Sequence, residues 1–402
     1  MENKNEWKKV KLGDIGEIVS GGTPKTSVKE YWNGNISWLT PKDFSNKNYK
    51  YWNKGERNIT KEGLKNSSAK LLPKGTVLFT SRAPIGYVGI SDTNLCTNQG
   101  FKNIIVNEEN SNEFIYYLLK FITPQIINIA GGSTFKEISA TALRDFEVYI
   151  PKSKKYQEKI AKILSDIDAK IELNNKINNN LEEQIQVLFS KWLSNNFKFS
   201  NKVTLEEVCS KITDGSHFSP KDNSLSSIPM LSVKDMEKFD FNLKSCKHIS
   251  ETDYQKMLMN DCVPKINDIL VAKDGSYLKE IFICNEERRI AILSSIAIFR
   301  PNLKKIYPEI LLAFLKSPNL LKEVRDNYVS GSALPRIVLR DFKKLSFYLP
   351  SIEIQSEISS LFYSIRKQIA KNIMENEKLI NLKNYLLPKL MNGEIDVKNI
   401  EL

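Results

Sequence analysis

The chain contains one residue pattern twice, and this duplication limits the possible folds more than any other feature of the sequence. Six pairs of short runs match, and they keep the same order along the two halves. The sequence therefore predicts two similar domains in tandem. The matched runs begin at Val10 and Val203, at Ile36 and Ile228, at Gly75 and Asn267, at Gly132 and Gly331, at Leu143 and Leu339, and at Ile150 and Leu349.

Each copy predicts a compact α+β domain, because short β runs recur at matched positions around one apolar helix. The predicted helices cover residues 112–129 and 308–327. With 402 residues available, each domain is long enough to bury a core of its own. We place the first domain at residues 1–150 and the second at residues 201–349.

A heptad pattern follows each domain, in residues 151–200 and 350–402, and it predicts two long helices. Both seams carry two asparagines at matching positions, which would disfavour slipped registers. We expect an antiparallel coiled coil, because a pseudo-twofold axis relating the halves requires it. The alternative is two independent helices, each packed on its own domain. The predicted seam residues are Ile160, Leu164, Ile167, Ile171, Asn174, Asn178 and Leu181, with Ile358, Phe362, Ile365, Ile369, Asn372, Asn376 and Leu379.

The formal net charge of +12 and the pI near 9.2 favour an anionic partner such as nucleic acid. A bias toward Lys, Asn and Ile could produce the same charge without such a partner. The five cysteines form no C-x-x-C pair, which argues against a disulfide framework and a zinc cluster. No signal peptide or membrane span is visible. We expect a soluble cytoplasmic protein with no membrane partner.

Common catalytic motifs are missing from the sequence. It has no Gly-Lys dipeptide for a phosphate-binding loop and no G-x-G for a dinucleotide or S-adenosylmethionine. It has no Asn-Pro-Pro or Asp-Pro-Pro run to hold a flipped base, and only two histidines. We therefore expect a binding protein with no catalytic residues, no metal and no cofactor of its own.

Four polar loops recur at matched points of the two copies. The first pair sets Ser20-Gly-Gly-Thr-Pro against Thr213-Asp-Gly-Ser-His, and the second sets Thr40-Pro-Lys-Asp against Ser232-Val-Lys-Asp. The third sets Ser81-Arg-Ala-Pro-Ile-Gly against Lys273-Asp-Gly-Ser-Tyr, and so contrasts Arg82 with Asp274, and the fourth sets Gly131-Gly-Ser-Thr against Ser330-Gly-Ser-Ala. Small residues would let backbone N–H groups approach phosphates, while polar side chains would contact phosphates and base edges. Arg82 suits guanine, and Asp274 would accept from a cytosine amino group. The same residue types are common in ordinary turns, and His217 also fits a solvated loop.

The duplicated pattern resembles the specificity subunit of type I restriction-modification systems over essentially the whole chain. The resemblance rests on the Gly-Gly-Thr-Pro loop, on Trp38-Leu-Thr-Pro, on the helix starts at Gln157 and Gln355, and on the closing run Leu386-Leu-Pro-Lys-Leu-Met-Asn-Gly-Glu-Ile. It implies two target recognition domains, each reading one half of a bipartite double-stranded DNA site, and two antiparallel helices that set the spacing.

The resemblance also implies DNA-binding positions and partners. Two methylation subunits with S-adenosylmethionine would methylate adenine, and two restriction subunits with ATP and Mg would cleave. We expect the methylation subunits to dock on the exposed helix flanks and on residues 389–395. Carried over to this chain, the loop positions are Gly21, Gly22, Thr23, Pro24, Thr40, Lys42, Ser81, Arg82, Gly132, Ser133 and Thr134, then Asp214, Gly215, Ser216, His217, Ser232, Lys234, Lys273, Asp274, Gly331 and Ser332.

Two other functions fit the sequence. One is a DNA-binding regulator that works without enzymes, and the other is an interaction scaffold whose basic charge is incidental. Association with a methylation subunit would distinguish the specificity subunit from the regulator. Steep salt dependence of DNA binding would distinguish both of them from the scaffold.

Overall fold

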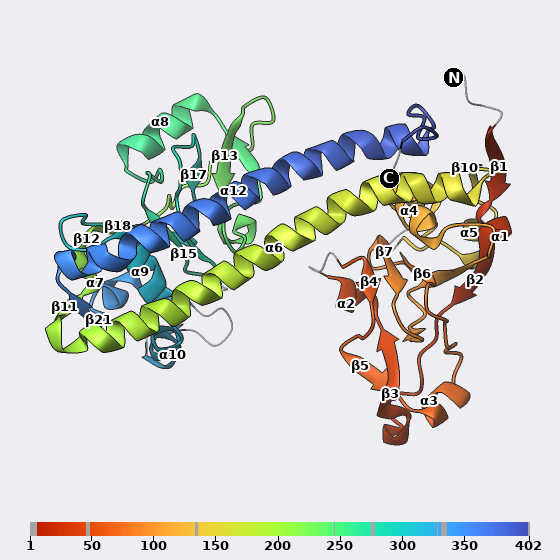
Figure 1. Ribbon diagram of the computed structural model, residues 1–402, viewed down its shortest axis with the longest axis horizontal. Helices are drawn as coiled ribbons and strands as arrows, with labels where there is room; N and C mark the ends of the chain where they lie inside the picture. Colours follow the sequence, from red (N-terminus) through yellow and green to blue (C-terminus); the bar gives the residue numbers. More distant parts are fainter. Residues whose placement is uncertain are drawn as a thin grey trace. The chain divides into compact units, whose positions relative to one another are not determined.

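The computed structural model describes residues 6–45, 49–132, 136–244, 246–274, 278–327, 329–330 and 336–400. The chain forms two compact units: Met1–Glu172 with Asn376–Leu402, and Leu173–Glu375. Each unit holds one α+β domain together with part of helix α6 (Lys154–Asn196) and part of helix α12 (Ile352–Met391) (Figure 1). The tandem α+β fold class is thus confirmed. No helix among the described residues is long and apolar enough to cross a membrane.

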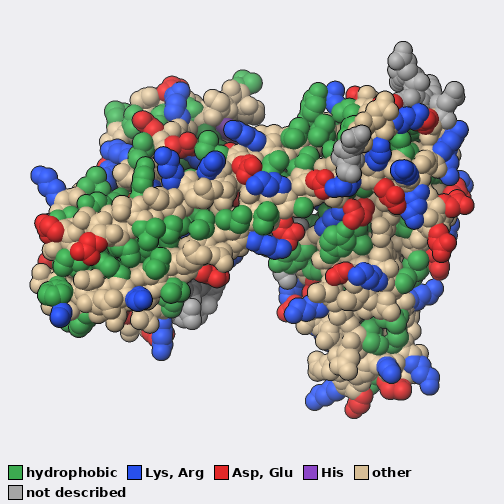
Figure 2. Space-filling view, viewed as in Figure 1, with side chains coloured by type: hydrophobic (Ala, Val, Ile, Leu, Met, Phe, Trp, Pro, Cys, Tyr) green, Lys and Arg blue, Asp and Glu red, His purple; other side chains and the backbone are tan. Residues whose placement is uncertain are grey.

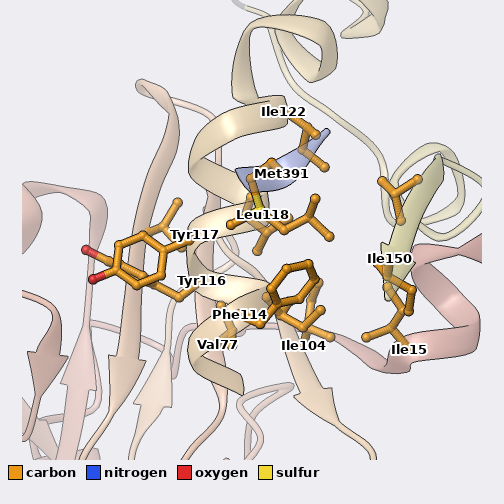
Figure 3. Close-up of a cluster of buried hydrophobic side chains, with 14 of the residues drawn as sticks. Ile15, Val77, Ile104, Phe114, Tyr116, Tyr117, Leu118, Ile122, Ile150 and Met391 are labelled. Carbon is orange, nitrogen blue, oxygen red and sulfur yellow. The ribbon is translucent and has the colours of Figure 1, made fainter. Parts of the chain in front are cut away.

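Unit 1 is built on a five-stranded sheet whose central strand is apolar on both faces. The helix α4 (Asn112–Ile129) packs on this sheet and begins where the Ser111 hydroxyl accepts a hydrogen bond from the Phe114 N–H. Figure 3 shows Phe114, Leu118 and Ile122 on one face of α4, directed into the core that also holds Met391 from α12. The sheet order is β2 (Gly16–Ser20), β9 (Lys102–Val106), β6 (Val77–Ser81), β7 (Ile85–Ser91) and β4 (Tyr51–Trp52).

Two smaller sheets complete the domain of unit 1. One pairs β1 (Trp7–Lys11) with β10 (Glu147–Pro151) and closes the domain beside the start of α6. The other has the order β5 (Arg57–Ile59), β3 (Trp32–Leu39) and β8 (Cys96–Thr97), with β3 and β8 parallel.

Unit 2 repeats this topology. A fourth, two-stranded sheet pairs β19 (Val329–Ser330) with β20 (Arg336–Ile337). The other three sheets keep the strand order of unit 1, except that the main sheet has four strands and ends at the counterpart of β7, and β13 and β17 are again parallel. They are β12 (Cys209–Asp214), β18 (Ile296–Pro301), β15 (Ile269–Ala272) and β16 (Ile281–Ile283); β14 (Lys247–Ile249), β13 (Ile228–Leu231) and β17 (Ala291–Ile292); and β11 (Ser200–Thr204) with β21 (Ser346–Pro350).

The single helix predicted over residues 308–327 is wrong, because two helices occupy this stretch. They are α9 (Pro308–Leu315) and α10 (Pro318–Asn327). Pro318 has no N–H to continue the helical bonding and disfavours helical geometry at the residue before it. It therefore ends the first helix and begins the second.

The structure also corrects two of the sequence matches. Ser20 lies opposite Lys102 and Asp214 lies opposite Ala297, so Ser20 corresponds to Asp214 and not to Thr213. The cause is a β-bulge between Cys209 and Lys211, which adds one residue to β12.

The second correction concerns the two Leu-Arg-Asp-Phe runs, which are not equivalent. The Leu12 N–H donates to the Phe146 carbonyl, and the Leu205 N–H donates to the Leu345 carbonyl. Phe146 therefore corresponds to Leu345 and not to Phe342. Leu143 and Phe342 fill the equivalent core position, and both are fully buried. The equivalent positions in the two domains are therefore identified by burial and not by residue identity.

The long helices pair in an antiparallel direction, as predicted. In unit 1 the Tyr156 hydroxyl donates to Asp396 (3.0 Å), and Lys383 Nζ lies 2.5 Å from Asp168 Oδ1. The predicted seam residues assigned to this unit are buried or half-buried. As residue numbers rise along α6, those of their partners on α12 fall.

Unit 2 shows the same direction. Asn372 Nδ2 donates to Asn178 Oδ1 (2.7 Å), and Asn174 Nδ2 donates to Glu375 Oε2 (2.9 Å). All predicted seam residues in this unit are also buried or half-buried, and the seam asparagines are among the buried ones.

A buried glutamine attaches each long helix to its domain. Gln157 Nε2 donates to the Pro151 carbonyl (3.0 Å), and Gln157 Oε1 accepts from the Ser111 N–H (2.9 Å). Gln355 makes the matching pair with Pro350 (2.9 Å) and the Tyr307 N–H (3.2 Å). Each glutamine thus links the closing strand and the segment before the sheet-covering helix to the first turn of the long helix.

Candidate nucleic-acid interface

In unit 1 the four predicted loops converge on one segment, residues 97–102, which we call the first hub. It connects β8 to β9, and the sequence analysis did not single it out. Backbone hydrogen bonds join the first and third loops, and the residues beside the second and fourth loops, to the hub or to one another. They run from the Gly22 N–H to Thr97 O (2.9 Å), from the Asn98 N–H to Leu39 O (2.9 Å), from the Ser81 N–H to Gly100 O (2.7 Å), and from the Ile138 N–H to Ser81 O (3.1 Å).

Unit 2 repeats this arrangement around residues 292–297, the second hub. Its backbone bonds are the counterparts of those in unit 1, although most of the side chains differ. The equivalent bonds run from the Ser216 N–H to Ile292 O (2.7 Å), from the Leu293 N–H to Leu231 O (2.8 Å), and from the Lys273 N–H to Ser295 O (3.0 Å). The two domains thus share one backbone frame around their first three loops.

The glycines of the first loop are required by packing within the domain. A Cβ on Gly21 would lie 2.0 Å from Asn98 O, and one on Gly22 would lie 2.3 Å from the Ser68 carbonyl carbon. The N–H groups of both glycines donate to hub carbonyls, so neither is free for a phosphate in this structure. The Thr23 hydroxyl contacts Gln99, and Pro24 is buried.

In unit 2, Gly215 meets the same restriction. Its Cβ would lie 2.4 Å from Ile292 O, and its N–H donates to Ile296 O (3.0 Å). The Ser216 hydroxyl donates to Phe218 O (2.8 Å), within its own turn. Gly21 and Gly215 are therefore required by the close approach of the hub, and Gly22 by the close approach of Ser68.

The second loop holds its hydroxyl in a capping box. Thr40 Oγ1 donates to Asp43 Oδ2 (2.8 Å), and Ser232 Oγ donates to Asp235 Oδ2 (2.9 Å). Each aspartate also accepts from the backbone N–H of the same Thr or Ser, and both aspartates are buried. The spacing Ser/Thr-x-x-Asp was the sequence signal for this role.

The lysines of the second loop, Lys42 and Lys234, remain exposed. Lys42 Nζ lies 3.3 Å from Glu56 on the surface, an ion pair that contributes little. These ammonium groups are accessible to a phosphate.

The third and fourth loops of unit 1 meet through charged side chains. Ser81 is buried and donates to Gly100 O (3.1 Å). Arg82, 39% exposed, places Nη1 3.3 Å from Glu137 Oε2. Lys102 from the hub lies 3.5 Å from the other oxygen of Glu137. Sequence reasoning missed Lys102 and Glu137, because neither belongs to a motif and they meet only in the fold.

The fourth loop is described only in part. Gly132 is exposed and adopts a positive φ of 109°. Ser133, Thr134, Gly331 and Ser332 lie outside the described residues.

The corresponding site in unit 2 carries the opposite charge at the loop tip. Lys273 Nζ lies 3.3 Å from Asp214 Oδ2 and 3.5 Å from Asp274 Oδ1. Burial raises the pKa of the Asp214 carboxyl above its usual value, although Lys273 lies beside it. His217 is 79% exposed, with Nε2 3.6 Å from Asp214.

The first loop of unit 2 also borders a cleft with basic walls. Asp214, Gly215, Ser216 and His217 line it together with basic side chains that sequence reasoning missed. Lysine and arginine donate to phosphate oxygens, so this wall suits the DNA backbone. The signal in the sequence was the short basic run that begins at Arg340 and ends with Lys343 and Lys344.

No metal site accompanies these loops within the part of the chain that the structure describes, where no three His, Cys, Asp or Glu side chains gather. The five cysteines are free thiols, and burial raises the pKa of Cys96 and of Cys209 to about 12. The site thus consists of polar and charged loop side chains.

Comparisons with known proteins agree on one family. The family model described as the type I restriction modification DNA specificity domain matches residues 4–183 and again residues 199–382. The chain is 34% identical to the type I restriction enzyme MjaIX specificity subunit of Methanocaldococcus jannaschii, over 98% of this chain and 95% of that protein. It is 23% identical to the HindI specificity subunit of Haemophilus influenzae, over 97% and 100%.

A solved structure is similar in fold. The crystal structure of the S subunit of a type I restriction-modification system from M. genitalium is 18% identical, with a TM-score of 0.54 over 97% of each chain.

Proposed function

The chain belongs to the family of type I restriction-modification DNA specificity proteins, whose function is DNA sequence recognition, and we propose that it reads a bipartite double-stranded site with its two loop clusters. Each unit would read one half-site. The chain itself would carry out no chemistry, and it would direct adenine methylation and restriction by partner subunits.

One observation carries this proposal: equivalent backbone hydrogen bonds hold the loops in both units, while the side chains at the loop tips differ. The matched tip residues are Arg82 and Asp274. Arginine donates two hydrogen bonds to guanine O6 and N7, and aspartate accepts from the cytosine amino group. Two equal frames with opposite tip charges suit two half-sites of unlike sequence.

The long helices would set the distance between the half-sites. Helix α6 has 43 residues and α12 has 40, and neither is interrupted. At 1.5 Å per residue, each is about 60 Å long. The buried asparagine bond between Asn372 and Asn178 supports a fixed register, because a one-heptad slip would leave these amides against apolar side chains.

The partners in this proposal are two methylation subunits, which would carry S-adenosylmethionine, and two restriction subunits, which would carry ATP and Mg. The methylation subunits would dock on the exposed flanks of the long helices. Exposed apolar side chains there include Leu173, Val187, Met374 and Tyr385. Figure 2 shows hydrophobic side chains along the visible face of these helices in unit 2.

Residues 389–395 are a poorer docking surface than we expected. Leu390 and Met391 are buried in the core of unit 1, and Gly393 lies directly beside the Trp7 indole. Truncation after Pro388 would remove core side chains, so it would test folding instead of docking. The docking proposal is therefore confined to the helix flanks.

The test is base-modification sequencing of host DNA with and without the gene. We expect methylated adenines of one split motif to disappear when the gene is deleted and to return with a plasmid copy. An unchanged methylome, in a host whose methylation subunit is expressed, would contradict the proposal. A steep decrease of DNA binding with salt by the purified complex is expected as well, since phosphate contacts release counterions.

A further inference from the structure

We propose that Lys102 and Lys273 are equivalent positioning residues, and that each orients the side chain at the tip of its recognition loop, Arg82 or Asp274, for contact with a base. The inference rests on the proposed function and extends it to residues that do not touch DNA themselves. It follows from a lysine that occurs at one spatial position in both units but at different positions of the sequence.

The two lysines belong to neighbouring strands of the sheet, and each stands where the other unit has a different residue. Lys102 stands on β9, where unit 2 has Ala297, because Lys102 pairs with Ser20 and Ala297 pairs with Asp214. Lys273 follows β15, where unit 1 has Ser81, because both residues donate their N–H to the equivalent hub carbonyl. One unit therefore has Ser and Lys at this strand pair, and the other has Lys and Ala.

In each unit the lysine ammonium group lies near this pair of strand positions. Lys102 Nζ lies 3.4 Å from Ser81 Oγ, which occupies the position of Lys273. Lys273 Nζ lies 3.3 Å from Asp214 Oδ2, and Asp214 pairs with Ala297, which stands at the position of Lys102. The side chains are only 10% and 12% exposed. A buried ammonium costs free energy unless it is paired, and each of these two lysines lies beside a carboxylate.

The contact between the lysine and the loop-tip side chain differs between the two units, because the tip side chains carry opposite charges. Asp274 is an anion and contacts Lys273 directly, at 3.5 Å. Arg82 is a cation, and Lys102 would repel it. In unit 1 Glu137 stands between them, with one carboxylate oxygen 3.3 Å from Arg82 and the other 3.5 Å from Lys102. The carboxylate turns a repulsion into an attractive chain of alternating charges.

This geometry gives the lysine a positioning role and no direct contact with a base. A guanidinium with one edge held by a carboxylate keeps a fixed orientation, and less side-chain entropy is lost when it binds guanine. Removing Lys102 leaves Glu137 free to swing with Arg82. The expected loss is therefore in discrimination between bases and much less in overall DNA affinity.

The experiment moves the lysine to the neighbouring strand. The chain is purified with its methylation subunits, and binding is measured on duplexes carrying the split sequence found by base-modification sequencing, intact or with single-base changes. Lys102→Ala is expected to reduce discrimination about tenfold, the lower range for one bidentate contact, at the base position that Arg82→Ala affects. The double variant Ser81→Lys with Lys102→Ala, which copies unit 2, is expected to restore it.

Unit 2 provides the reciprocal pair, Lys273→Ser and Lys273→Ser with Ala297→Lys, and the untouched half-site is the internal control in each case. Glu137→Gln keeps the side-chain volume and is expected to reduce discrimination at the same base as Lys102→Ala. Should Lys102→Ala lower the melting temperature so far that it cannot be assayed, Glu137→Gln decides the question alone.

The inference is overturned if the assayable Lys102→Ala complex discriminates like the wild type, or if the relocated lysine does not restore discrimination in a complex that is folded. Unchanged discrimination with Glu137→Gln also overturns it. A wild-type complex without any preference for a split sequence would contradict the proposed function itself, which is a different outcome.

Discussion

Replacement of Gln157 by leucine tests how the recognition domain of unit 1 is attached to its long helix. The amide is fully buried and makes three hydrogen bonds: to Asn110 Oδ1 (2.8 Å), to Pro151 O (3.0 Å) and from the Ser111 N–H (2.9 Å). Leucine is similar in size but leaves all three partners buried without a bond. At about 1–3 kcal/mol for each unsatisfied group, partly relieved by water, we expect a loss of about 3–5 kcal/mol.

The assay uses the uneven distribution of tryptophan. Four of the five tryptophans lie in unit 1 and only Trp192 lies in unit 2, so fluorescence reports mainly on unit 1. In urea unfolding with a slope of about 2–3 kcal/mol/M, Gln157→Leu should lower the fluorescence midpoint by about 1–2 M. The matched control is Gln355→Leu, which breaks the equivalent bonds in unit 2.

We expect Gln355→Leu to shift the transition followed by circular dichroism while the main fluorescence transition stays in place. A fluorescence midpoint that moves by less than about 0.3 M in Gln157→Leu would refute the assignment of the amide as a structural link, since its three partners would then be satisfied in another way. Equal fluorescence shifts in both variants would refute the separate unfolding of the two units.

The remaining predictions concern recognition, spacing and pH. Arg82→Ala should alter methylation at one half-site only, by about tenfold at one base, and equal losses at both half-sites in methylome sequencing would contradict the modular reading. Deleting one heptad from each of α6 and α12 removes about 10 Å of helix and should shorten the preferred spacer by about three base pairs, which a library of spacer lengths measures. Asp261→Asn should destabilise unit 2 at pH 7. Burial alone would raise the pKa of the Asp261 carboxyl, but Lys211, Lys265 and Arg300 lower that pKa below 3.8. The stability that the carboxylate contributes above pH 3.8 is therefore lost as the pH falls through the folded-state pKa. The difference in urea midpoint between wild type and Asp261→Asn should accordingly shrink in acid.

The sequence was sufficient for the features that repeat locally. The duplicated runs predicted the tandem α+β domains, and the heptads predicted the long helices, because each run and each heptad is read from residues close together in the chain. The antiparallel direction followed from the pseudo-twofold relation of the two halves. The register of the repeat was harder to predict. A bulge of one residue after Cys209 moved the first loop match by one position, and nothing in the residue letters marks a bulge that the partner strand defines.

The candidate site was also only partly predictable from the sequence. Its loops were found from Gly, Ser, Thr and charged residues, but their partners were not, since Lys102 and Glu137 meet Arg82 only through the sheet and the hub. The glycines also had a different immediate cause from the one expected. Gly21 is small because the hub backbone passes within contact distance of it, and Gly22 because the backbone of Ser68 and Ala69 does.

The division of work between backbone and side chain explains how two such domains can differ in specificity without differing in fold. Each loop is held by main-chain bonds to its hub, and those bonds do not depend on residue type. Thr40 and Ser232 both carry a hydroxyl that closes a capping box, whereas Arg82 and Asp274 pair with charged side chains, Glu137 and Lys273. A change of tip charge then requires only a new electrostatic support, and the two units use different ones: a carboxylate bridge to Lys102 in one and a direct contact with Lys273 in the other. The support must change together with the tip, so Ser81, Arg82, Lys102 and Glu137 of unit 1 would have to be exchanged together.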